Sequence, residues 1–388
     1  MVRRVSPLRD FLANESASGI LLVMAAALGL IVANSPISNG YFDLLNLTLN
    51  LKFIGIEMTV LKFINYAMMT IFFFVVGLEI KRELTSGHLA RVRQAAAPFF
   101  AAIGGMLIPA GIYLLIAGDV APEGWAIPVA TDIALAVGVL SLMGSRVTQG
   151  LKAFLLALAV IDDIGAILII AIVYSTGIIF SWLVAACVAI LAILVLQRIG
   201  ISRIWVYVIV GALLWYNFYR AGLHPTLAGV ILGIMTPARQ WVGELNFLER
   251  LEHRVHPLSS FVVVPIFAFA NSGVELSQST WRAAINSPIA WGIIIGLAIG
   301  KPIGIFVTSL IFDRLRLAEL PIGTSNRSLF ATGSTAGIGF TVAIFIAKLA
   351  FETPEIQDLA VTAVIFGSLV SAIISILLFR FGRATHSR

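Results

Sequence analysis

Residues 153–173 read AFLLALAVIDDIGAILIIAIV, a run of twenty-one residues that is apolar except for two adjacent carboxylates, Asp162 and Asp163. A helix of this length spans the hydrocarbon core of a bilayer, and its rise of about 1.5 Å per residue places both acids roughly 15 Å from either water boundary. An ionisable side chain at that depth costs about 3 kcal/mol. Two such groups indicate a site for ions or protons; the alternative is a buried structural pair with satisfied hydrogen bonds.

The composition of the chain indicates a polytopic membrane protein. Of its 388 residues, 59% are hydrophobic and 12% are charged, and the mean hydropathy is +1.00. A soluble domain carries about 25% charged residues. The net charge of +6 does not require a nucleic-acid partner, because the positions of the basic residues explain it better. The single cysteine, Cys187, lies in an apolar run and indicates neither a disulfide nor a thiolate metal site.

The pattern of apolar segments predicts an all-α membrane protein with twelve transmembrane helices in a single transporter domain, 1–388. The segments lie at about residues 16–35, 59–80, 95–117, 122–143, 151–174, 181–197, 204–218, 222–236, 257–275, 288–312, 328–350 and 357–379. Two of them, 204–218 and 222–236, are short compared with the roughly 20 residues that a span needs. If these two formed one span, the count would be eleven and the C-terminus would lie outside.

The distribution of Lys and Arg predicts that both termini are cytoplasmic. With twelve spans, the inner segments hold twenty of the twenty-six basic residues, the outer segments hold five, and Lys301 lies within a span. Arg3, Arg4 and Arg9 precede the first apolar run, and no small-residue cleavage site follows a short apolar region. We therefore expect a retained first helix and not a cleaved signal peptide.

Two segments between the spans have patterns of their own. Residues 45–60 alternate apolar and polar side chains on both sides of Gly55, which predicts a two-stranded β-hairpin outside the membrane. An isolated hairpin is marginally stable in water. We therefore expect it to pack on a second copy of the chain or, as a local lid, on its own protein. Residues 238–254 are rich in charge, and we place them in a cytoplasmic surface helix.

Four ionisable side chains fall deep within the predicted spans: Asp132, Asp162, Asp163 and Lys301. Three acids and one base leave residual negative charge for a cation. Adjacent residues of a helix point about 100° apart, so one member of the aspartate pair can face Lys301 while its neighbour faces a water-filled cavity. A site that holds either a cation or protons on the same carboxylates has the chemistry of an exchanger.

Two of the predicted spans contain breaks. Residues 128–132 place a proline, Thr131 and Asp132 in the middle of the fourth span, and residues 333–341 concentrate glycines in the eleventh. Glycine and proline are unfavourable inside helices, and non-helical backbone in a membrane is tolerated only inside protein or along a cavity. The alternative is that the small residues only permit close helix packing.

The two breaks occupy matching positions in two blocks of three spans, residues 95–174 and 288–379. The blocks start on opposite sides of the membrane, which predicts inverted repeats. Interrupted helices at corresponding positions of inverted repeats indicate the binding site of a transporter. Facing half-helices leave dipole charge at their ends. Asp132 is suited to neutralise facing N-termini, and Lys301 to neutralise facing C-termini.

The motifs of the chain resemble those of the NhaA family of bacterial sodium/proton antiporters. The matching stretches, in family order, are 77–84 (GLEIKREL), 124–134 (GWAIPVATDIA), 161–163 (IDD), His224 with 226–229 (TLAG), 251–253 (LEH), 256–257 (HP), 267–271 (FAFAN), 300–302 (GKP) and 337–341 (GIGFT). They extend the resemblance over nearly the whole chain. Pro225, Val342 with Ala343, and the nearby Lys348 depart from the family pattern.

The resemblance implies crossing discontinuous helices in spans four and eleven, and electrogenic exchange of Na⁺ or Li⁺ for more than one proton in the bacterial inner membrane, with no cofactor. By similarity, Asp163 is the principal carboxylate for the transported ion and protons, and Asp162 is its partner, bridged to Lys301. Asp132 and Thr131 would line the crossing. From the residues alone, the roles of the two adjacent aspartates are interchangeable.

The resemblance also implies a cytoplasmic cluster that regulates transport by pH, made of Glu79, Arg82, Glu252, His253 and His256. His253 and His256 lie three residues apart on one helical face, and a histidine titrates near pH 6.5. The alternative is a solvated cluster beside the membrane with no regulatory role. The family's hairpin contacts a second protomer, which favours a homodimer through residues 45–60.

Two other functions fit parts of the pattern. An intramembrane aspartyl protease would use Asp132 with Asp162 or Asp163 to activate water, but the chain has no Gly-x-Gly-Asp sequence, and that mechanism does not need Lys301. A cation-coupled transporter of an organic substrate would need more aromatic, Arg and Asn side chains at the midplane than this chain offers.

Overall fold

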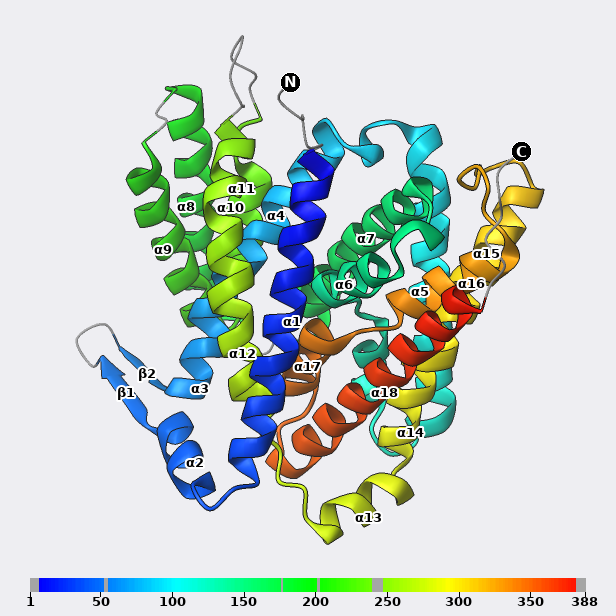
Figure 1. The fold of residues 1–388 in the computed structure, drawn as a ribbon. Coiled ribbons are helices and arrows are strands. Elements are labelled where there is room, and N and C mark those ends of the chain that lie inside the picture. The colour runs from blue at the N-terminus through cyan, green and yellow to red at the C-terminus, as the bar shows by residue number, and fades with distance from the viewer. Residues whose placement is uncertain (1–6, 52–54, 176, 201–202, 239–246, 382–388) are drawn as a thin grey trace, which may run out of the picture. The chain divides into compact units, whose positions relative to one another are not determined.

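The computed structural model describes residues 7–51, 55–175, 177–200, 203–238 and 247–381, and nearly all regular structure in them is helical (Figure 1). The chain divides into two compact units. Unit 1 consists of Met1–Tyr41, Arg91–Ala166 and Ala268–Arg388, and unit 2 of Phe42–Ala90 and Ile167–Phe267. The unit boundaries fall inside three helices, α2, α7 and α12.

Unit 1 contains most of the helices. They are α1 (Pro7–Ala33), α5 (Val92–Ala117), the 3₁₀ helix η4 (Pro122–Val129), α6 (Ile133–Met143), η5 (Gly144–Arg146), the greater part of α7 (Gln149–Val173), the end of α12 (Val264–Asn271), α13 (Gln278–Asn286), α14 (Pro288–Ile295), the π-helical turn η7 (Gly296–Gly300), α15 (Lys301–Arg314), α16 (Asn326–Ala336), α17 (Phe340–Ala350) and α18 (Pro354–Arg380).

Close packing of α5 against α15 holds the middle of unit 1 together. A Cβ on Gly304 of α15 would lie 2.1 Å from the carbonyl oxygen of Gly104 on α5, so only glycine permits this approach. Small residues at helix interfaces are the usual means of close association in membranes, where apolar surface is already solvated by lipid. The contact brings the segment that carries Lys301 against α5.

Unit 2 contains the small sheet and the remaining helices. They are α2 (Ser38–Asn46), which begins in unit 1, β1 (Thr48–Leu51), β2 (Ile56–Thr59), α3 (Val60–Phe63), the π-helical η2 (Ile64–Met68), α4 (Met69–Thr85), η3 (His88–Ala90), α8 (Phe180–Arg198), α9 (Ile204–Ala221), α10 (Leu227–Met235), α11 (Phe247–Leu258) and η6 (Ser259–Val263). A Cβ on Gly77 of α4 would lie 2.6 Å from the carbonyl of Val230 on α10, so these two helices also meet backbone to backbone.

The predicted hairpin is present. Strands β1 and β2 are antiparallel, with Thr48 opposite Thr59 and Leu51 opposite Ile56. The turn residues 52–54 lie outside the described residues. The hairpin is shorter than the predicted range of 45–60, because Leu45 and Asn46 end helix α2 and Val60 begins α3.

In the described part of the chain, seven helices are long and apolar enough to cross a membrane. They are Val60–Thr85, Gln94–Ala117, Pro122–Arg146, Gln149–Val173, Phe180–Arg198, Pro288–Arg314 and Pro354–Arg380. Two bent pairs, Ala17–Ala33 with Ser38–Asn46 and Asn326–Ala336 with Phe340–Ala350, raise the number to nine if each pair is one span. The chain is therefore a multi-pass membrane protein.

The short segments at 204–218 and 222–236 form two separate helices. Gly222 ends α9 in the left-handed conformation, at φ 82°, which is a common helix stop. The following helix, α10, has nine residues and is roughly 14 Å long, which is less than half the thickness of the hydrocarbon core.

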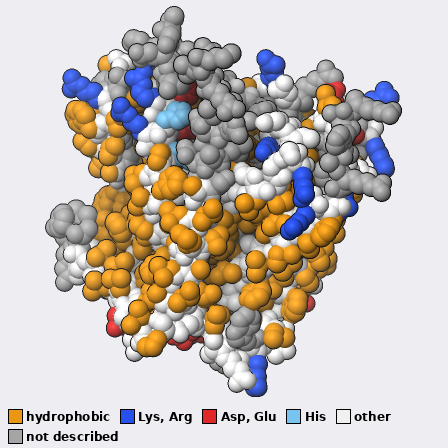
Figure 2. Space-filling view, viewed as in Figure 1, with side chains coloured by type: hydrophobic (Ala, Val, Ile, Leu, Met, Phe, Trp, Pro, Cys, Tyr) orange, Lys and Arg blue, Asp and Glu red, His pale blue; other side chains and the backbone are white. Residues whose placement is uncertain are grey.

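The surface of unit 1 carries the apolar side chains expected of a membrane protein. Ile20 and Ile31 of α1 are 60% and 65% exposed, and Leu369 of α18 is 55% exposed. Figure 2 shows apolar side chains covering the face over these helices. Exposed apolar area on this scale is unfavourable in water and indicates contact with lipid.

Candidate functional site

The fourth predicted span is interrupted as expected. The 3₁₀ helix η4 ends at Val129, Ala130 is extended, and Asp132 is the N-cap of α6 with φ −91° and ψ 103°. Pro128 lacks an N–H, and the side chains of Thr131 and Asp132 offer the backbone alternative hydrogen bonds. These properties of the sequence explain why a continuous helix does not form here.

The eleventh predicted span is interrupted by residues 337–339. Helix α16 ends at Ala336 and α17 begins at Phe340, and their axes differ by 47°. The virtual Cβ of Gly337 would lie 2.4 Å from the carbonyl of Leu297. A larger residue at this position is therefore excluded by the packing.

The two breaks meet within unit 1. The N–H of Asp132 donates to the carbonyl of Ile338 at 2.7 Å, and Thr131 Oγ1 lies 3.0 Å from the carbonyl of Ala336. Backbone groups that each helix loses at its break thus find partners in the other break. Non-helical backbone inside a membrane requires this kind of internal satisfaction.

The carboxylate of Asp132 joins the N-termini of two helices. Its Oδ1 accepts from the N–H of Leu135 in α6 at 3.0 Å, and its Oδ2 accepts from the N–H and the hydroxyl of Thr341 in α17 at 3.0 and 2.6 Å. Helix N-termini present unsatisfied N–H groups and partial positive charge. A single negative side chain therefore serves both.

Lys301 is a cation at the C-terminal end of a helix, whereas Asp132 is an anion at two helix N-termini. Its side chain is fully buried, its Nζ lies 2.9 Å from Asp162 Oδ2, and Nζ also donates to the carbonyl of Val129, the last residue of η4. A cation at the C-terminal end of a helix is favourable for the same reason as an anion at the N-terminus. Lys301 directly follows the π-helical turn η7, a feature often found at functional sites.

The aspartate pair lies on α7 in the same region of unit 1. Asp162 is fully buried and Asp163 is 4% exposed. Asp162 Oδ2 lies 2.7 Å from Thr131 Oγ1 as well as 2.9 Å from Lys301 Nζ, whereas Oδ1 has no hydrogen-bond partner among the described residues. Carboxylate, hydroxyl and carbonyl oxygens are the ligands that hard cations prefer. Asp162 therefore has one carboxylate oxygen with protein partners and one that is available to a cation.

The five residues of the predicted pH-sensing cluster lie on two helices of unit 2, α4 and α11. Arg82 Nη1 donates to Glu252 Oε1, and Glu79 lies close enough to Glu252 for their charges to interact. His253 is exposed, and Ser260 Oγ lies 3.5 Å from His256 Nε2. The other predicted part of this surface, residues 239–246, lies outside the described residues.

The environment of this cluster changes two titrations. Burial raises the pKa of the Glu252 carboxyl above its ordinary value of 4.5, and the positive charges of Arg82 and His253 act in the opposite direction. Burial lowers the pKa of His256 below 6.5, and Arg82 and His253 lower it further. Both shifts favour the neutral form of the side chain.

Several polar residues around these clusters were not predicted from the sequence. Thr341 contacts Asp132 directly, and its position immediately after the glycine-rich break was the available signal. Ser368 of α18 accepts from the N–H of Phe340 at 3.1 Å, and no motif marks it. Glu83 and Glu249 add negative charge near Glu252. Glu83 follows Glu79 by four residues and Glu249 precedes Glu252 by three, and each spacing indicates a shared helix face.

Comparisons with known proteins agree with the motifs. The model of the family described as Na+/H+ antiporter 1 matches residues 9–379. A Na(+)/H(+) antiporter NhaA from Shewanella sp. (strain MR-7) is 46% identical over 373 residues, which cover 95% of each chain. A protein of the same name from Escherichia coli (strain UTI89 / UPEC) is 46% identical over 374 residues, which cover 95% of this chain and 96% of that one. The chain thus belongs to the Na+/H+ antiporter 1 family, the family of the NhaA antiporters.

Proposed function

We propose that the chain is an electrogenic, pH-regulated Na⁺(Li⁺)/H⁺ antiporter of the bacterial inner membrane, which works by alternating access at Asp162 and Asp163. The observation that carries this proposal is the buried pair of Asp162 and Lys301, 2.9 Å apart, where two interrupted helices meet. Membership of the antiporter family makes the chain a transporter and not an enzyme. The protease alternative is therefore set aside.

The exchange follows from competition for the same oxygen atoms. A carboxylate must lose its proton before it binds a cation, so cation binding releases protons and protonation releases the cation. Asp163 and the Oδ1 of Asp162 provide the oxygens for Na⁺ or Li⁺, with the Thr131 hydroxyl close by. Lys301 holds Asp162 Oδ2 and compensates part of the negative charge while the site is empty. Uptake of more than one proton for each Na⁺ moves net positive charge inward.

The meeting point of the breaks is suited to alternating access. Binding sites built from interrupted helices at the centre of inverted repeats open to either side by movement of one part of the bundle against the other. The repeats would be 95–174 and 288–379 in a twelve-span fold with cytoplasmic termini, as the charge distribution indicates. Asp132 would hold the N-termini of α6 and α17 in register during the movement.

The cluster on α4 and α11 would regulate this movement by pH. Glu252 and His256 both favour their neutral forms, and the Arg82–Glu252 pair couples the two helices. Among the described residues, Glu79, Glu83, Glu249 and His253 are further charged groups that interact with this pair. A change in the charge of this cluster alters the attraction between α4 and α11, which is the physical basis of a switch.

The hairpin would form a homodimer through its free edge. Ile56 and Met58 are buried within unit 2, so the apolar face of the sheet packs on its own protein. A two-stranded sheet still has unpaired backbone groups along each outer edge, and such an edge pairs readily with another chain. The dimer therefore needs only the edge of β1, while the apolar face serves the local packing.

Replacement of Asp163 by Asn tests the proposed function. In everted membrane vesicles with a fluorescent pH dye, we expect the wild type to give Na⁺-dependent and Li⁺-dependent dequenching, and Asp163→Asn to give none. Asp119→Asn is a matched control, because Asp119 is exposed. Full activity of Asp163→Asn would refute the proposal, and a screen against K⁺ and organic anions separates cation exchange from transport of an organic substrate.

A further inference from the structure

Helix α18 carries three buried serines on one face, at positions 368, 371 and 375, which are spaced by three and four residues. Residues with this spacing lie above one another on a helix. A serine inside a helix can satisfy its hydroxyl by bonding to the carbonyl four residues earlier. Each of these three instead contacts a different segment near the breaks.

Ser368 satisfies a backbone group at the start of α17. The N–H of Phe340, the first residue of this helix, donates to Ser368 Oγ at 3.1 Å, and the N–H of the next residue, Thr341, donates to Asp132 Oδ2 at 3.0 Å. The first N–H groups of any helix lack partners within it. Two adjacent donors of α17 are thus held by side chains from two different elements, and Ser368 is the neutral counterpart of Asp132.

Ser371 and Ser375 contact the other elements of the site. Ser371 Oγ donates to the carbonyl of Leu297, in the π-helical turn before Lys301, at 3.2 Å. In the i to i+5 pattern of this turn, the donor for Leu297 would be residue 302, which is Pro302 and has no N–H. Ser375 Oγ lies 2.6 Å from Thr335 Oγ1 on α16.

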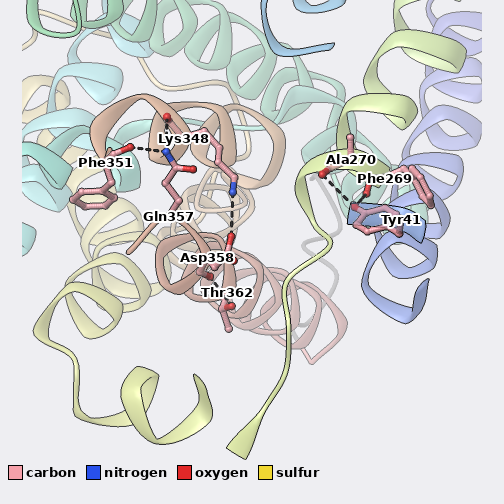
Figure 3. A network of polar contacts seen from close by, with 8 residues as sticks. All are labelled: Tyr41, Phe269, Ala270, Lys348, Phe351, Gln357, Asp358 and Thr362. Carbon is pink, nitrogen blue, oxygen red and sulfur yellow. Dashed lines mark hydrogen bonds and ion pairs between the residues drawn. The ribbon is translucent and has the colours of Figure 1, made fainter. Parts of the chain in front are cut away.

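Helix α18 also holds the far end of α17, as Figure 3 shows. The side-chain amide of Gln357 donates to the carbonyl of Phe351 at 2.6 Å and to that of Lys348 at 3.3 Å, and Lys348 Nζ lies 3.1 Å from Asp358 Oδ1. A carbonyl in the last turn of α17 and the carbonyl of its C-cap residue therefore share a donor on the first turn of α18. Both ends of the half-helix are attached to the same neighbour.

We propose that α18 is the element that positions the ion site, and that Ser368 is a positioning residue, which keeps the N-terminus of α17 aligned with Asp132. Without the hydroxyl, the Phe340 N–H is buried and unsatisfied, and the start of α17 shifts toward any other acceptor. Such a shift moves Thr341 relative to Asp132 and changes the geometry of the break that also contains Thr131. The hydrogen bond of Ser368 is to the backbone of α17 and not to the aspartate pair.

The test compares Ser368→Ala with Ser368→Thr and with Ser309→Ala. Ser309 of α15 is equally buried, and its hydroxyl has no hydrogen-bond partner among the described residues, so its removal costs no such bond. We measure the apparent KM for Na⁺, the maximal rate and the pH profile in vesicles, each normalised to the amount of folded protein. Ser368→Ala leaves the buried N–H of Phe340 without its acceptor. We therefore expect the apparent KM to rise about tenfold, equivalent to 1.4 kcal/mol.

The expected pattern also includes a shifted pH profile for Ser368→Ala, near wild-type behaviour for Ser368→Thr, and no change for Ser309→Ala. An unchanged KM and pH profile in folded Ser368→Ala would overturn the proposal, as would an equal effect of Ser309→Ala. If Ser368→Ala does not fold, Ser371→Ala decides by the same measurements, because it removes a bond to the turn that directly precedes Lys301.

This inference rests on the proposed ion site, and the two can fail separately. If Asp163→Asn transports at the wild-type rate, the proposed function fails. If Asp163→Asn is inactive while folded Ser368→Ala keeps the wild-type KM and pH profile, the ion site stands and only the positioning role of α18 is refuted.

Discussion

Lys301 Nζ lies 2.9 Å from Asp162 Oδ2, and both side chains are fully buried. The pair connects the start of α15 in one predicted repeat with the carboxylate-bearing helix of the other, and Lys301 also reaches the C-terminus of η4. Burying two charges is costly even when they are paired, so the arrangement is weak evidence for a role in stability alone. Its place at the meeting of two broken helices supports the proposed role in transport.

Removal of Lys301 should destabilise the fold strongly. Lys301→Met leaves the charge of Asp162 buried without its partner, which costs about 3 to 5 kcal/mol, measured as a lower Tm in detergent. Lys348→Met is the control: its partner Asp358 is 38% exposed, and pairs of this kind contribute about 1 kcal/mol or less. The double variant Lys301→Met with Asp162→Asn should recover part of the lost Tm. Equal Tm values for Lys301→Met and Lys348→Met would contradict this account.

The hydroxyl of Thr341 should contribute to the attachment of α17 at the break. Thr341→Val removes the 2.6 Å bond to Asp132 and leaves the backbone bond in place, and we expect a loss of about 1 to 2 kcal/mol together with slower Na⁺-dependent dequenching. Thr362→Val on α18 removes a hydroxyl that donates to the carbonyl of Asp358. This control should transport at the wild-type rate. Identical rates for both variants would show that the contact with Asp132 has no special role.

The pH dependence of stability should carry the signature of His256. Its pKa is lowered in the fold, so the contribution of the neutral imidazole is present above the ordinary pKa of 6.5 and is lost as the pH falls through the lowered value. His256→Gln should therefore flatten the decrease in Tm between about pH 6.5 and pH 5. Parallel curves for the wild type and His256→Gln would contradict this assignment.

Glu252 should change stability with pH in the opposite direction to His256. Its pKa is raised above 4.5, so its contribution is present below pH 4.5 and is lost as the pH rises through the raised value. Glu252→Gln, which cannot ionise, should keep the stability of the protonated form at higher pH, apart from the lost attraction to Arg82. Glu57→Gln, on the exposed face of β2, is the control and should not change the curve. A Glu252→Gln curve with the wild-type shape would show that Glu252 does not titrate in this range.

The dimer can be tested at the free edge of β1. The N–H of Val60 donates to the carbonyl of Leu47, so the backbone of Leu47 and Leu49 faces β2 while that of Thr48 and Asn50 faces outward. Asn50→Pro therefore blocks the edge without the loss of a bond within the hairpin. We expect light scattering to change from dimer to monomer, with the Tm of the protomer nearly unchanged. A dimer that persists in Asn50→Pro would place the interface elsewhere.

The centre of the site was predictable because its residues are conspicuous in an apolar sequence. Asp132, Asp162, Asp163 and Lys301 are the charged groups deep within the predicted spans, and proline and glycine clusters indicate where a helix ends. The hairpin was predictable from its period-two alternation. Assignment of the ion to Asp163 and of Lys301 to Asp162 came from family resemblance, since neighbouring helical residues are equivalent until their surroundings are known.

Other features were not accessible from the sequence for physical reasons. Ser368 is an ordinary residue for a membrane helix, and its bond to Phe340 depends on the tertiary position of the break in another helix. Helix α2 was not predicted, because Ser38–Asn46 is short and mixed in polarity. The predicted twelve spans exceed the seven to nine found by length and hydropathy in the described residues, because segments such as α10 are too short to be recognised alone.

Proton release on Na⁺ binding tests the central claim most directly. Purified protein in weakly buffered detergent solution, with a pH indicator, receives Na⁺ at a pH where the transporter is active. The account predicts acidification that saturates with Na⁺ and Li⁺, is absent with K⁺, and disappears in Asp163→Asn while Asp119→Asn behaves as the wild type. Na⁺ binding without proton release, or equal release from Asp163→Asn, would contradict an exchange of cation and protons on the aspartate pair.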